Sequence, residues 1–513
     1  MVNGMGAQHL GNVQQLLAKE KDLTLYESSL HEHEGILFGI VRRGIDKLLL
    51  VWPVGNGSSL PETEFQGERS GSGDHEFLLC ECTHAQAEAI RKRFEFTRPV
   101  LVGKVNSYGL GDRLGNAGPA HIRAIRETGF RPVLAQQSIR ELERTRRTAE
   151  EVMDAATWSV FQEGYHEGFG ADGDHLKTTD DLDRMVEARY TMFTIDPSDY
   201  VVNKALAMKK DELLAAFQAL PWDELDDSPD LLLGRYNGLD ADLGEGNRLQ
   251  PDRAEVLQGM VKYGKVIAHT RMMAEYLKKT WPDHPAELEL SVDETDEPTT
   301  LFEHYLVASE LSRLGVELVS LAPRFCGDFE KGIDFKGDLE QFREEYLQHL
   351  AIAALFGGYK LSVHSGSDKF SVYRVVGSLR SGAVHVKTAG TSYLEALRTV
   401  AVADPGFFRE IMSFSLTRFE EDKKTYHISA DVNRIPDPAT LKGAELTALL
   451  DDDHTRQVLH VAYGSVLSGE QPQARTWKKR LMQVLEENEE LHMEHLVRHF
   501  EKHLEPFGDR GQV

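Results

Sequence analysis

Short apolar runs alternate with longer amphipathic segments along most of the chain after about residue 98. These runs have the length and composition of buried strands in a parallel sheet. The predicted strands cover residues 100–105, 132–135, 170–176, 192–195, 288–292, 316–321, 359–363 and 383–386. A helical pattern follows each of them, so this part of the chain predicts eight consecutive βα units.

Eight βα units are the number that closes a (β/α)8, or TIM, barrel, and we predict this α/β fold for the central part of the chain. The main alternative, a doubly wound sheet, has a glycine-rich turn after its first strand. Gly109, Gly111 and Gly115 resemble such a turn, but three residues rather than two separate the second and third glycines. The barrel is therefore the better interpretation.

The same pattern divides the chain into three parts. Residues 1–97 predict a small N-terminal α+β domain with strands at 35–41, 47–52 and 77–82, a helix at 85–94 and a helical or irregular start over 1–20. The barrel is assigned to residues 98–405, with a helical insertion at 203–285. Residues 406–513 predict a mostly helical C-terminal extension with a short strand at 426–430 and a last helix at 477–503.

Composition narrows the classes of function. Lys and Arg number 58 against 83 Asp and Glu, which gives a net charge of −25 and argues against a nucleic-acid partner. The three cysteines, Cys80, Cys82 and Cys326, form neither a disulfide framework nor a paired zinc motif. No apolar run reaches the ~18 residues of a membrane helix and no signal-peptide core is visible. We therefore expect a cytoplasmic protein without a membrane partner, and leave oligomerisation open.

A barrel would bring the polar residues at its strand ends together on one rim. That rim contains two imidazoles, several carboxylates and no cysteine, a set that suits Zn, Mn, Ni, Co or Fe rather than Mg or Ca. The absence of HExxH and GxSxG motifs disfavours zincin peptidases and α/β-hydrolases. The rim residues are Asn106, Ser107, Gln136, Gln137, Ser138, Asp174, His175, Lys177, Asp196, Asp293, Glu294, Arg324, His364, Ser365, Lys387 and Thr388.

Several motifs in residues 100–400 resemble those of one enzyme family, and they occur in the same order. They are GLGDRLG at 109–115, AQQSIREL at 135–142, FQEGY at 161–165, GADGDHLKT at 170–178, TIDPS at 194–198, APRF at 322–325, FEKGID at 329–334 and HSGSDK at 364–369. The chain resembles the tagaturonate epimerases of hexuronate catabolism, a family with sugar 4-epimerase relatives. The resemblance implies a barrel enzyme with one divalent metal per site that interconverts tagaturonate and fructuronate, or tagatose and fructose.

The chemistry at C4 explains why a metal would be needed. The C4 proton is two bonds from the ketone carbon and is not acidified by it, so simple deprotonation is unpromising. A retro-aldol route breaks the C3–C4 bond after a base removes the C4 hydroxyl proton, and re-addition then gives the other epimer. A metal would act as a Lewis acid, and flanking acid/base groups would handle the hydroxyl proton.

His175 and His364 are the strongest candidates for metal ligands, because each closes a predicted strand and imidazole is the commonest metal ligand. The third ligand is expected to be a carboxylate from the loop after the sixth strand. Glu330 is preferred over Asp328 and Asp334. We expect the site to hold one divalent cation, Zn, Mn, Ni or Co.

Asp174 and Glu294 are the candidate acid/base groups. Asp174 precedes His175, so the two side chains would point apart on a regular strand, but both reach the mouth if the strand end bends. Asp293 is the rival of Glu294, and strand register does not separate them. Lys177, Arg324 and Lys387 are candidates for binding a substrate carboxylate. The remaining predicted substrate-binding residues are Gln137 and Ser365.

Two other classes of function stay open. A class II metal-dependent aldolase would use nearly the same chemistry but release its products. A non-catalytic sugar-binding protein would bind sugar whether or not a chelator is present, and the many ionisable residues on the predicted rim disfavour it.

Overall fold

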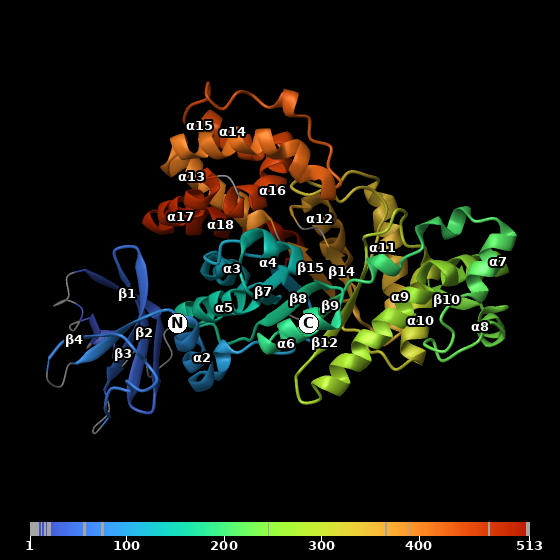
Figure 1. The fold of residues 1–513 in the computed structure, drawn as a ribbon, viewed down its shortest axis with the longest axis horizontal. Helices are drawn as coiled ribbons and strands as arrows, with labels where there is room; N and C mark the ends of the chain where they lie inside the picture. Colours follow the sequence, from blue (N-terminus) through green and yellow to red (C-terminus); the bar gives the residue numbers. More distant parts are fainter. Residues whose placement is uncertain are drawn as a thin grey trace.

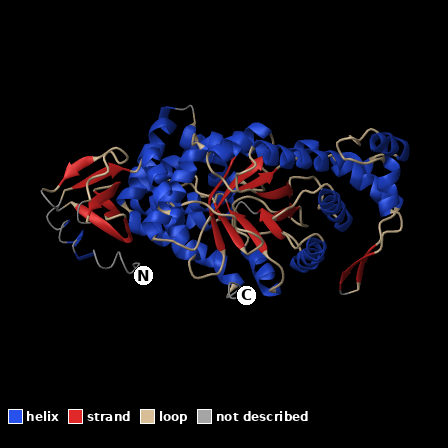
Figure 2. Cartoon of the chain, turned by 90° about the horizontal axis from the view of Figure 1, so that it is seen from below, coloured by secondary structure: helices blue, strands red, loops and turns tan. Residues whose placement is uncertain are grey.

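The computed structural model describes residues 10–508 except 12, 15–16, 18–21, 55–57, 73–75, 245, 365–366, 389 and 470–471, and for residues 472–475 it describes the backbone only. A closed parallel barrel lies at the centre of the molecule, between an N-terminal sheet, an insertion and a C-terminal group of helices (Figure 1). Figure 2 shows the barrel strands surrounded by helices. Among the described residues, no helix combines the length and apolarity needed to cross a bilayer.

The predicted eight-stranded barrel is confirmed, and the order of its strands follows the chain. The last strand pairs with the first, so that His385 stands beside Ser107 and Thr388 beside Leu110. The strands are β6 (Ser107–Leu110), β7 (Arg131–Ser138), β8 (Gly170–Leu176), β9 (Met192–Ile195), β12 (Glu287–Val292), β13 (Ser320–Pro323), β14 (Lys360–His364) and β15 (Val384–Thr388).

The first strand differs from the prediction. Residues 100–105 form no strand, and β6 begins at Ser107. Val100 and Leu101 are 43% and 49% exposed, and Gly103 adopts a left-handed φ of +73°, so this apolar run is a surface connection that cannot continue as extended backbone. Ser107 consequently stands at the amino end of the barrel, and its expected place on the rim is wrong, as is that of Asn106 just before it.

Helices from the described part of the chain surround the barrel strands. The helical pattern after the second predicted strand forms two helices, because Arg146 ends the first in a left-handed conformation and Thr148 starts the second with a capping box. The helices are α3 (Gly118–Ile125), α4 (Ile139–Thr145), α5 (Ala149–Glu163), α6 (Thr179–Glu187), α10 (Leu301–Arg313), α11 (Leu339–Leu355), α12 (Phe370–Leu379) and α13 (Thr391–Ala403).

The insertion between β9 and β12 contains helices and a two-stranded hairpin. Its elements are α7 (Lys210–Gln218), α8 (Pro229–Tyr236), β10 (Ala241–Gly244), β11 (Asn247–Leu249) and α9 (Arg253–Thr280). The long helix α9 begins with a capping box at Asp252 and packs against α10. Figure 1 shows the smaller elements of the insertion at the far end of α9 and α10 from the barrel.

The N-terminal domain is an antiparallel sheet with one following helix, in the strand order β1-β2-β3-β5-β4. The sequence did not predict β1, whose outward positions are polar, or the short β4; most of the segment predicted over 1–20 lies outside the described residues. Phe161 of α5 packs into one apolar face of this sheet and so joins it to the barrel. The elements are β1 (Leu23–His33), β2 (Ile36–Arg43), β3 (Asp46–Pro53), β4 (Glu68–Ser70), β5 (Phe77–Glu81) and α2 (His84–Arg93).

The C-terminal part consists of helices that share an apolar core with α13 of the barrel. Residues 426–430 form no strand, and the predicted helix 477–503 is two helices that change direction at Asn488. The last helix packs against α3 and α13 (Figure 1). The helices are α14 (Pro405–Asp422), α15 (Ala444–Ala448), α16 (Asp453–Ser468), α17 (Pro472–Glu487) and α18 (Glu489–Leu504).

Candidate active site

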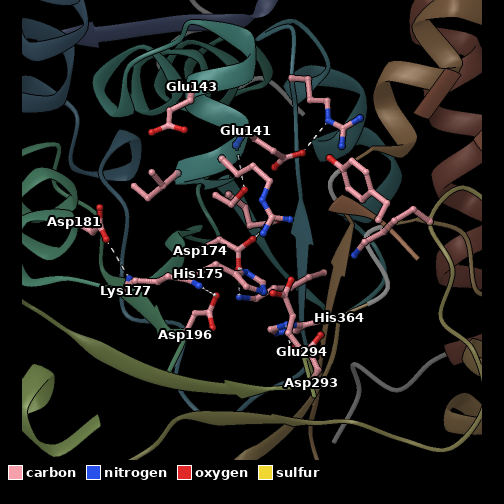
Figure 3. Close-up of a pocket in the computed structure, with 18 of the residues that line it drawn as sticks. Glu141, Glu143, Asp174, His175, Lys177, Asp181, Asp196, Asp293, Glu294 and His364 are labelled. Atoms are coloured by element: carbon pink, nitrogen blue, oxygen red, sulfur yellow. Dashed lines mark hydrogen bonds and ion pairs between the residues drawn. The ribbon is translucent and has the colours of Figure 1, made fainter. Parts of the chain in front are cut away.

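A polar cavity of about 330 Å³ lies at the carboxyl ends of the barrel strands. A barrel mouth is where (β/α)8 enzymes bind their substrates. Figure 3 shows carboxylate, imidazole and ammonium groups converging on it. The lining residues are Arg113, Gln136, Ser138, Ile139, Arg140, Glu141, Glu143, Asp174, His175, Lys177, Asp181, Asp196, Asp293, Glu294, Lys331, His364, Lys387, Tyr426 and His460.

The end of β8 is bent, and the bend turns two successive side chains toward the cavity. His175 has a φ of 56°, in the left-handed region, and the pairing of β8 with β9 changes register between Gly173 and Leu176. An irregularity of this kind re-aims side chains that would otherwise alternate between the two faces of a strand. Asp174 and His175 consequently both line the cavity.

His175, His364 and Asp293 form a group whose potential ligand atoms all lie within 4.8 Å of one another. The rings of the two histidines are 5.3 Å apart, although they come from β8 and β14. Asp293 follows β12, and its Oδ1 lies 3.2 Å from His364 Nδ1. Two imidazoles and a carboxylate are a donor set for a divalent transition metal. The predicted pair of histidines is thus together, with Asp293 as the neighbouring carboxylate.

A carboxylate holds the other ring nitrogen of each histidine. Asp174 Oδ1 lies 2.7 Å from His175 Nδ1, and Glu289 Oε1 lies 2.7 Å from His364 Nε2. Burial disfavours a charged imidazole at His175, but the Asp174 carboxylate outweighs it and raises the pKa of His175 to about 10. Carboxylates in this position orient metal-binding histidines and fix which nitrogen faces the metal.

Lys387 lies beneath this group and is surrounded by acidic side chains. Its Nζ is 2.7 Å from Asp172 Oδ2, 2.9 Å from Asp174 Oδ1 and 2.8 Å from Glu289 Oε1. These carboxylates outweigh the effect of burial and hold the pKa of Lys387 well above its usual value. Lys387 lines the cavity, but its ammonium is already paired with three carboxylates, and its role in binding a substrate carboxylate stays a prediction.

Glu330, the carboxylate preferred from the sequence as third ligand, lies away from the two histidines. It accepts hydrogen bonds from Ser429 and Gln457, and Lys336 Nζ is 3.3 Å from its Oε1. The residues whose potential metal-ligand atoms lie within 4.8 Å of those of Glu330 are Asp328 and His427. The loop after β13 folds back on the C-terminal part, so the position of Glu330 along the chain did not reveal that it lies away from the two histidines.

The predicted substrate-binding residues have different surroundings. Gln137 is buried and does not line the cavity, whereas Gln136 does, because successive residues of β7 face opposite sides. Lys177 lines the cavity, and its Nζ binds Ser198 Oγ and Asp199 Oδ1 at 3.0 Å. Ser365 lies outside the described residues. Arg324 lines an adjoining cavity of about 560 Å³.

Glu294, one of the two predicted acid/base groups, lines both cavities, and its carboxylate forms no hydrogen bond or ion pair with a described residue. The other, Asp174, is already engaged by His175, Lys387 and Gln136. The two carboxylates therefore have distinct surroundings. The Glu294 carboxylate is available to bind a ligand, whereas the Asp174 carboxylate already binds neighbouring side chains.

The sequence did not single out two cations at the mouth. Arg140 and Lys331 line both cavities, and their side-chain nitrogens form no hydrogen bond or ion pair with any described residue. Arg140 follows the first residue of α4, and Lys331 follows Glu330 in the loop after β13. Their presence in the resembling motifs AQQSIREL and FEKGID was the only signal in the sequence, and a surface cation carries no distinguishing pattern.

Comparisons with known proteins assign nearly the full length of the chain to one family. The model of the tagaturonate epimerase family, UxaE, matches residues 26–507. The Thermotoga maritima protein named tagaturonate/fructuronate epimerase is 43% identical over 482 residues, which cover 94% of this chain and 96% of that protein. Native and glycerol-complexed crystal structures of the fructuronate-tagaturonate epimerase UxaE from Cohnella laeviribosi are 36% identical and superpose with a TM-score of 0.87; each match covers 98% of this chain and 99% of the other. The chain belongs to the tagaturonate epimerase family and is an isomerase of the epimerase class.

Proposed function

We propose that this protein interconverts D-tagaturonate and D-fructuronate by inverting C4. Its near full-length similarity to epimerases named for these two sugar acids supports the proposal. The observation that carries it is the cavity itself, which is lined by the histidine–aspartate group and by Arg140 and Lys331, two cations with no hydrogen-bond or ion-pair partner among the described residues. A sugar acid needs such a cation for its carboxylate, in a protein whose net charge is otherwise −25.

The residues at the mouth fit a divalent metal. His175 and His364 each have one ring nitrogen held by a carboxylate and the other available on the side of Asp293. These three residues would hold the metal, and the sequence candidate Glu330 would not. A bound cation would supply Lewis-acid stabilisation of the negative charge that develops on substrate oxygens when a carbon–carbon bond beside a ketone breaks.

Inversion at C4 requires a group that moves the C4 hydroxyl proton. Glu294 is exposed in the cavity and is the carboxylate best placed to accept it. Loss of this proton allows the C3–C4 bond to break, which leaves an aldehyde at C4. Rotation of the aldehyde fragment presents its other face to C3, and the bond re-forms while Glu294 returns the proton. The hydrogen on C4 stays on its carbon throughout.

Asp174 contributes to this reaction indirectly, through the residues that it holds in place. It holds His175 and Lys387 and is itself fully engaged, so we assign it the role of a positioning residue rather than of the proton acceptor. Arg140 and Lys331 would bind the sugar carboxylate through charge-assisted hydrogen bonds. The polar cavity at the barrel mouth would hold the aldehyde fragment between cleavage and re-addition. A cytoplasmic location remains a prediction from the sequence.

The test is incubation of the purified protein with D-fructuronate, followed by NMR detection of tagaturonate, with fructose in a parallel reaction. Formation of tagaturonate, and its suppression by a chelator, would support the proposal. Accumulation of two three-carbon fragments would identify an aldolase instead. Binding of the sugar acid without turnover would identify a sugar-binding protein.

A further inference from the structure

A second group of imidazole and carboxylate side chains lies outside the barrel mouth. Asp368 Oδ1 is 3.0 Å from His499 Nε2 and 2.9 Å from His503 Nε2, and the two Nε2 atoms are 3.1 Å apart. All three residues are buried, and none lines the active-site cavity. The histidines are one turn apart on α18, and Asp368 precedes α12. The group therefore joins the C-terminal helix to the barrel.

The neighbours of the two histidines determine which nitrogen faces the group. His499 Nδ1 lies 3.3 Å from Glu395 Oε1, and a carboxylate can only accept, so Nδ1 carries the proton. In the neutral ring this leaves a lone pair on Nε2, directed at Asp368. The Tyr108 hydroxyl lies 2.6 Å from His503 Nδ1 and can either donate to it or accept from it. Where it accepts, Nδ1 carries the proton and Nε2 of His503 also presents a lone pair. Outer partners of this kind are typical of metal-binding histidines.

Asp368 Oδ1 and His499 Nε2 are therefore two lone-pair atoms that face each other, and His503 Nε2 is a third in the tautomer with the proton on Nδ1. These atoms repel one another unless a positive charge lies among them, either a proton or a metal ion. The three donor atoms are 2.9–3.1 Å from one another. Ligand atoms that lie 2.0–2.1 Å from a tetrahedral zinc ion are about 3.3 Å apart, so the spacing of the three atoms is close to that of a zinc site. Arg456 pairs with the other oxygen of Asp368, Oδ2, and leaves Oδ1 for the histidines.

We propose that Asp368, His499 and His503 bind a second divalent cation of the zinc type, separate from the active site. Two imidazoles and one carboxylate are a donor set for Zn²⁺, Co²⁺ or Ni²⁺. All three donors are buried and none reaches the cavity, so the role of this ion is structural. It ties α18 to the segment that follows β14, four residues beyond His364.

Metal analysis after reloading the stripped protein with Co²⁺ tests the proposal. Wild-type protein should bind two equivalents per chain, and the His175→Ala/His364→Ala variant should keep one. Adding His503→Gln to that variant should remove the remaining equivalent, together with the visible absorption of tetrahedral Co²⁺. His495→Gln on the same helix, where His495 Nδ1 binds Thr399, is the matched control and should leave the metal content unchanged.

Thermal unfolding gives a second measurement that needs no change at His503. A chelator should lower the melting temperature of the His175→Ala/His364→Ala variant if that variant still holds the structural ion. The proposal would be overturned if the His175→Ala/His364→Ala variant binds no Co²⁺ and a chelator does not change its melting temperature. That result would identify a shared proton among the three side chains. Neither measurement depends on catalytic activity, so the result stands apart from the proposed epimerase reaction.

Discussion

Glu289 Oε1 lies 2.7 Å from His364 Nε2, and this carboxylate comes from the middle of strand β12 rather than from a strand end. Glu289 also contacts Lys387, which in turn contacts Asp174 behind His175. The two candidate ligand histidines are therefore supported by one connected layer of buried charges. Metal affinity should depend on this layer as well as on the ligands themselves.

Removal of the proposed ligands should remove the metal. His175→Ala and Asp293→Ala are each expected to lose the active-site cation and with it the activity, because each removes one of three protein donors. Glu330→Gln is the matched control and should retain that cation, since Glu330 binds Ser429 and Gln457 elsewhere. Metal content measured after gel filtration checks both expectations. An active-site cation retained in Asp293→Ala, or lost in Glu330→Gln, would reverse the assignment of the third ligand.

Substitutions of Asp174 and Glu294 should lower activity for different reasons. Asp174→Asn removes the carboxylate that orients His175, so metal affinity should fall by about 10- to 100-fold and activity should recover partly when metal is added. Glu294→Gln should lower kcat by about 10²-fold or more while the metal stays bound, as expected for an acid/base group. Metal titrations and turnover measured on the same preparations separate the two. Full activity of Glu294→Gln would assign the proton transfer to another residue.

Arg140 should determine the preference for a sugar acid. A charge-assisted hydrogen bond contributes about 1.5–3 kcal/mol, so Arg140→Gln should raise KM for fructuronate by about 10- to 100-fold. KM for the neutral ketose should change little. Arg324→Gln is the comparison, because Arg324 lines only the adjoining cavity. Equal effects of Arg140→Gln on the two substrates would show that Arg140 does not bind the carboxylate.

Lys387 should matter for stability rather than for substrate affinity. Lys387→Met would leave Asp172, Asp174 and Glu289 buried without their shared cation. Breaking buried ion pairs in this way costs about 3–5 kcal/mol, so the melting temperature should fall markedly or the protein should fail to fold. Lys331→Met, at the cavity mouth, is the control and should leave the melting temperature near that of the wild type. A stable Lys387→Met variant with a raised KM would support a direct role in substrate binding.

The sequence predicted the barrel and the two histidines because both depend on local patterns. Strand and helix alternation marks the βα units, and His175 and His364 stand at recognisable strand ends. The place of the third carboxylate depends on how loops fold in space, so Glu330 was preferred over Asp328 and Asp334 without contact information. Asp293 was considered only as the rival of Glu294 for the acid/base role. The internal charges Asp172 and Glu289 were visible as ionisable residues within otherwise buried strands, but the choice of site residues considered only strand ends.

The most direct test of the central claim, inversion of C4 by cleavage of the C3–C4 bond, is turnover of fructuronate in D2O followed by NMR of the product. The C4 hydrogen never leaves its carbon on this route, so tagaturonate should form with protium at C4. Tagaturonate that carries deuterium at C4 would show that the C4–H bond breaks and exchanges with solvent, and would contradict the mechanism.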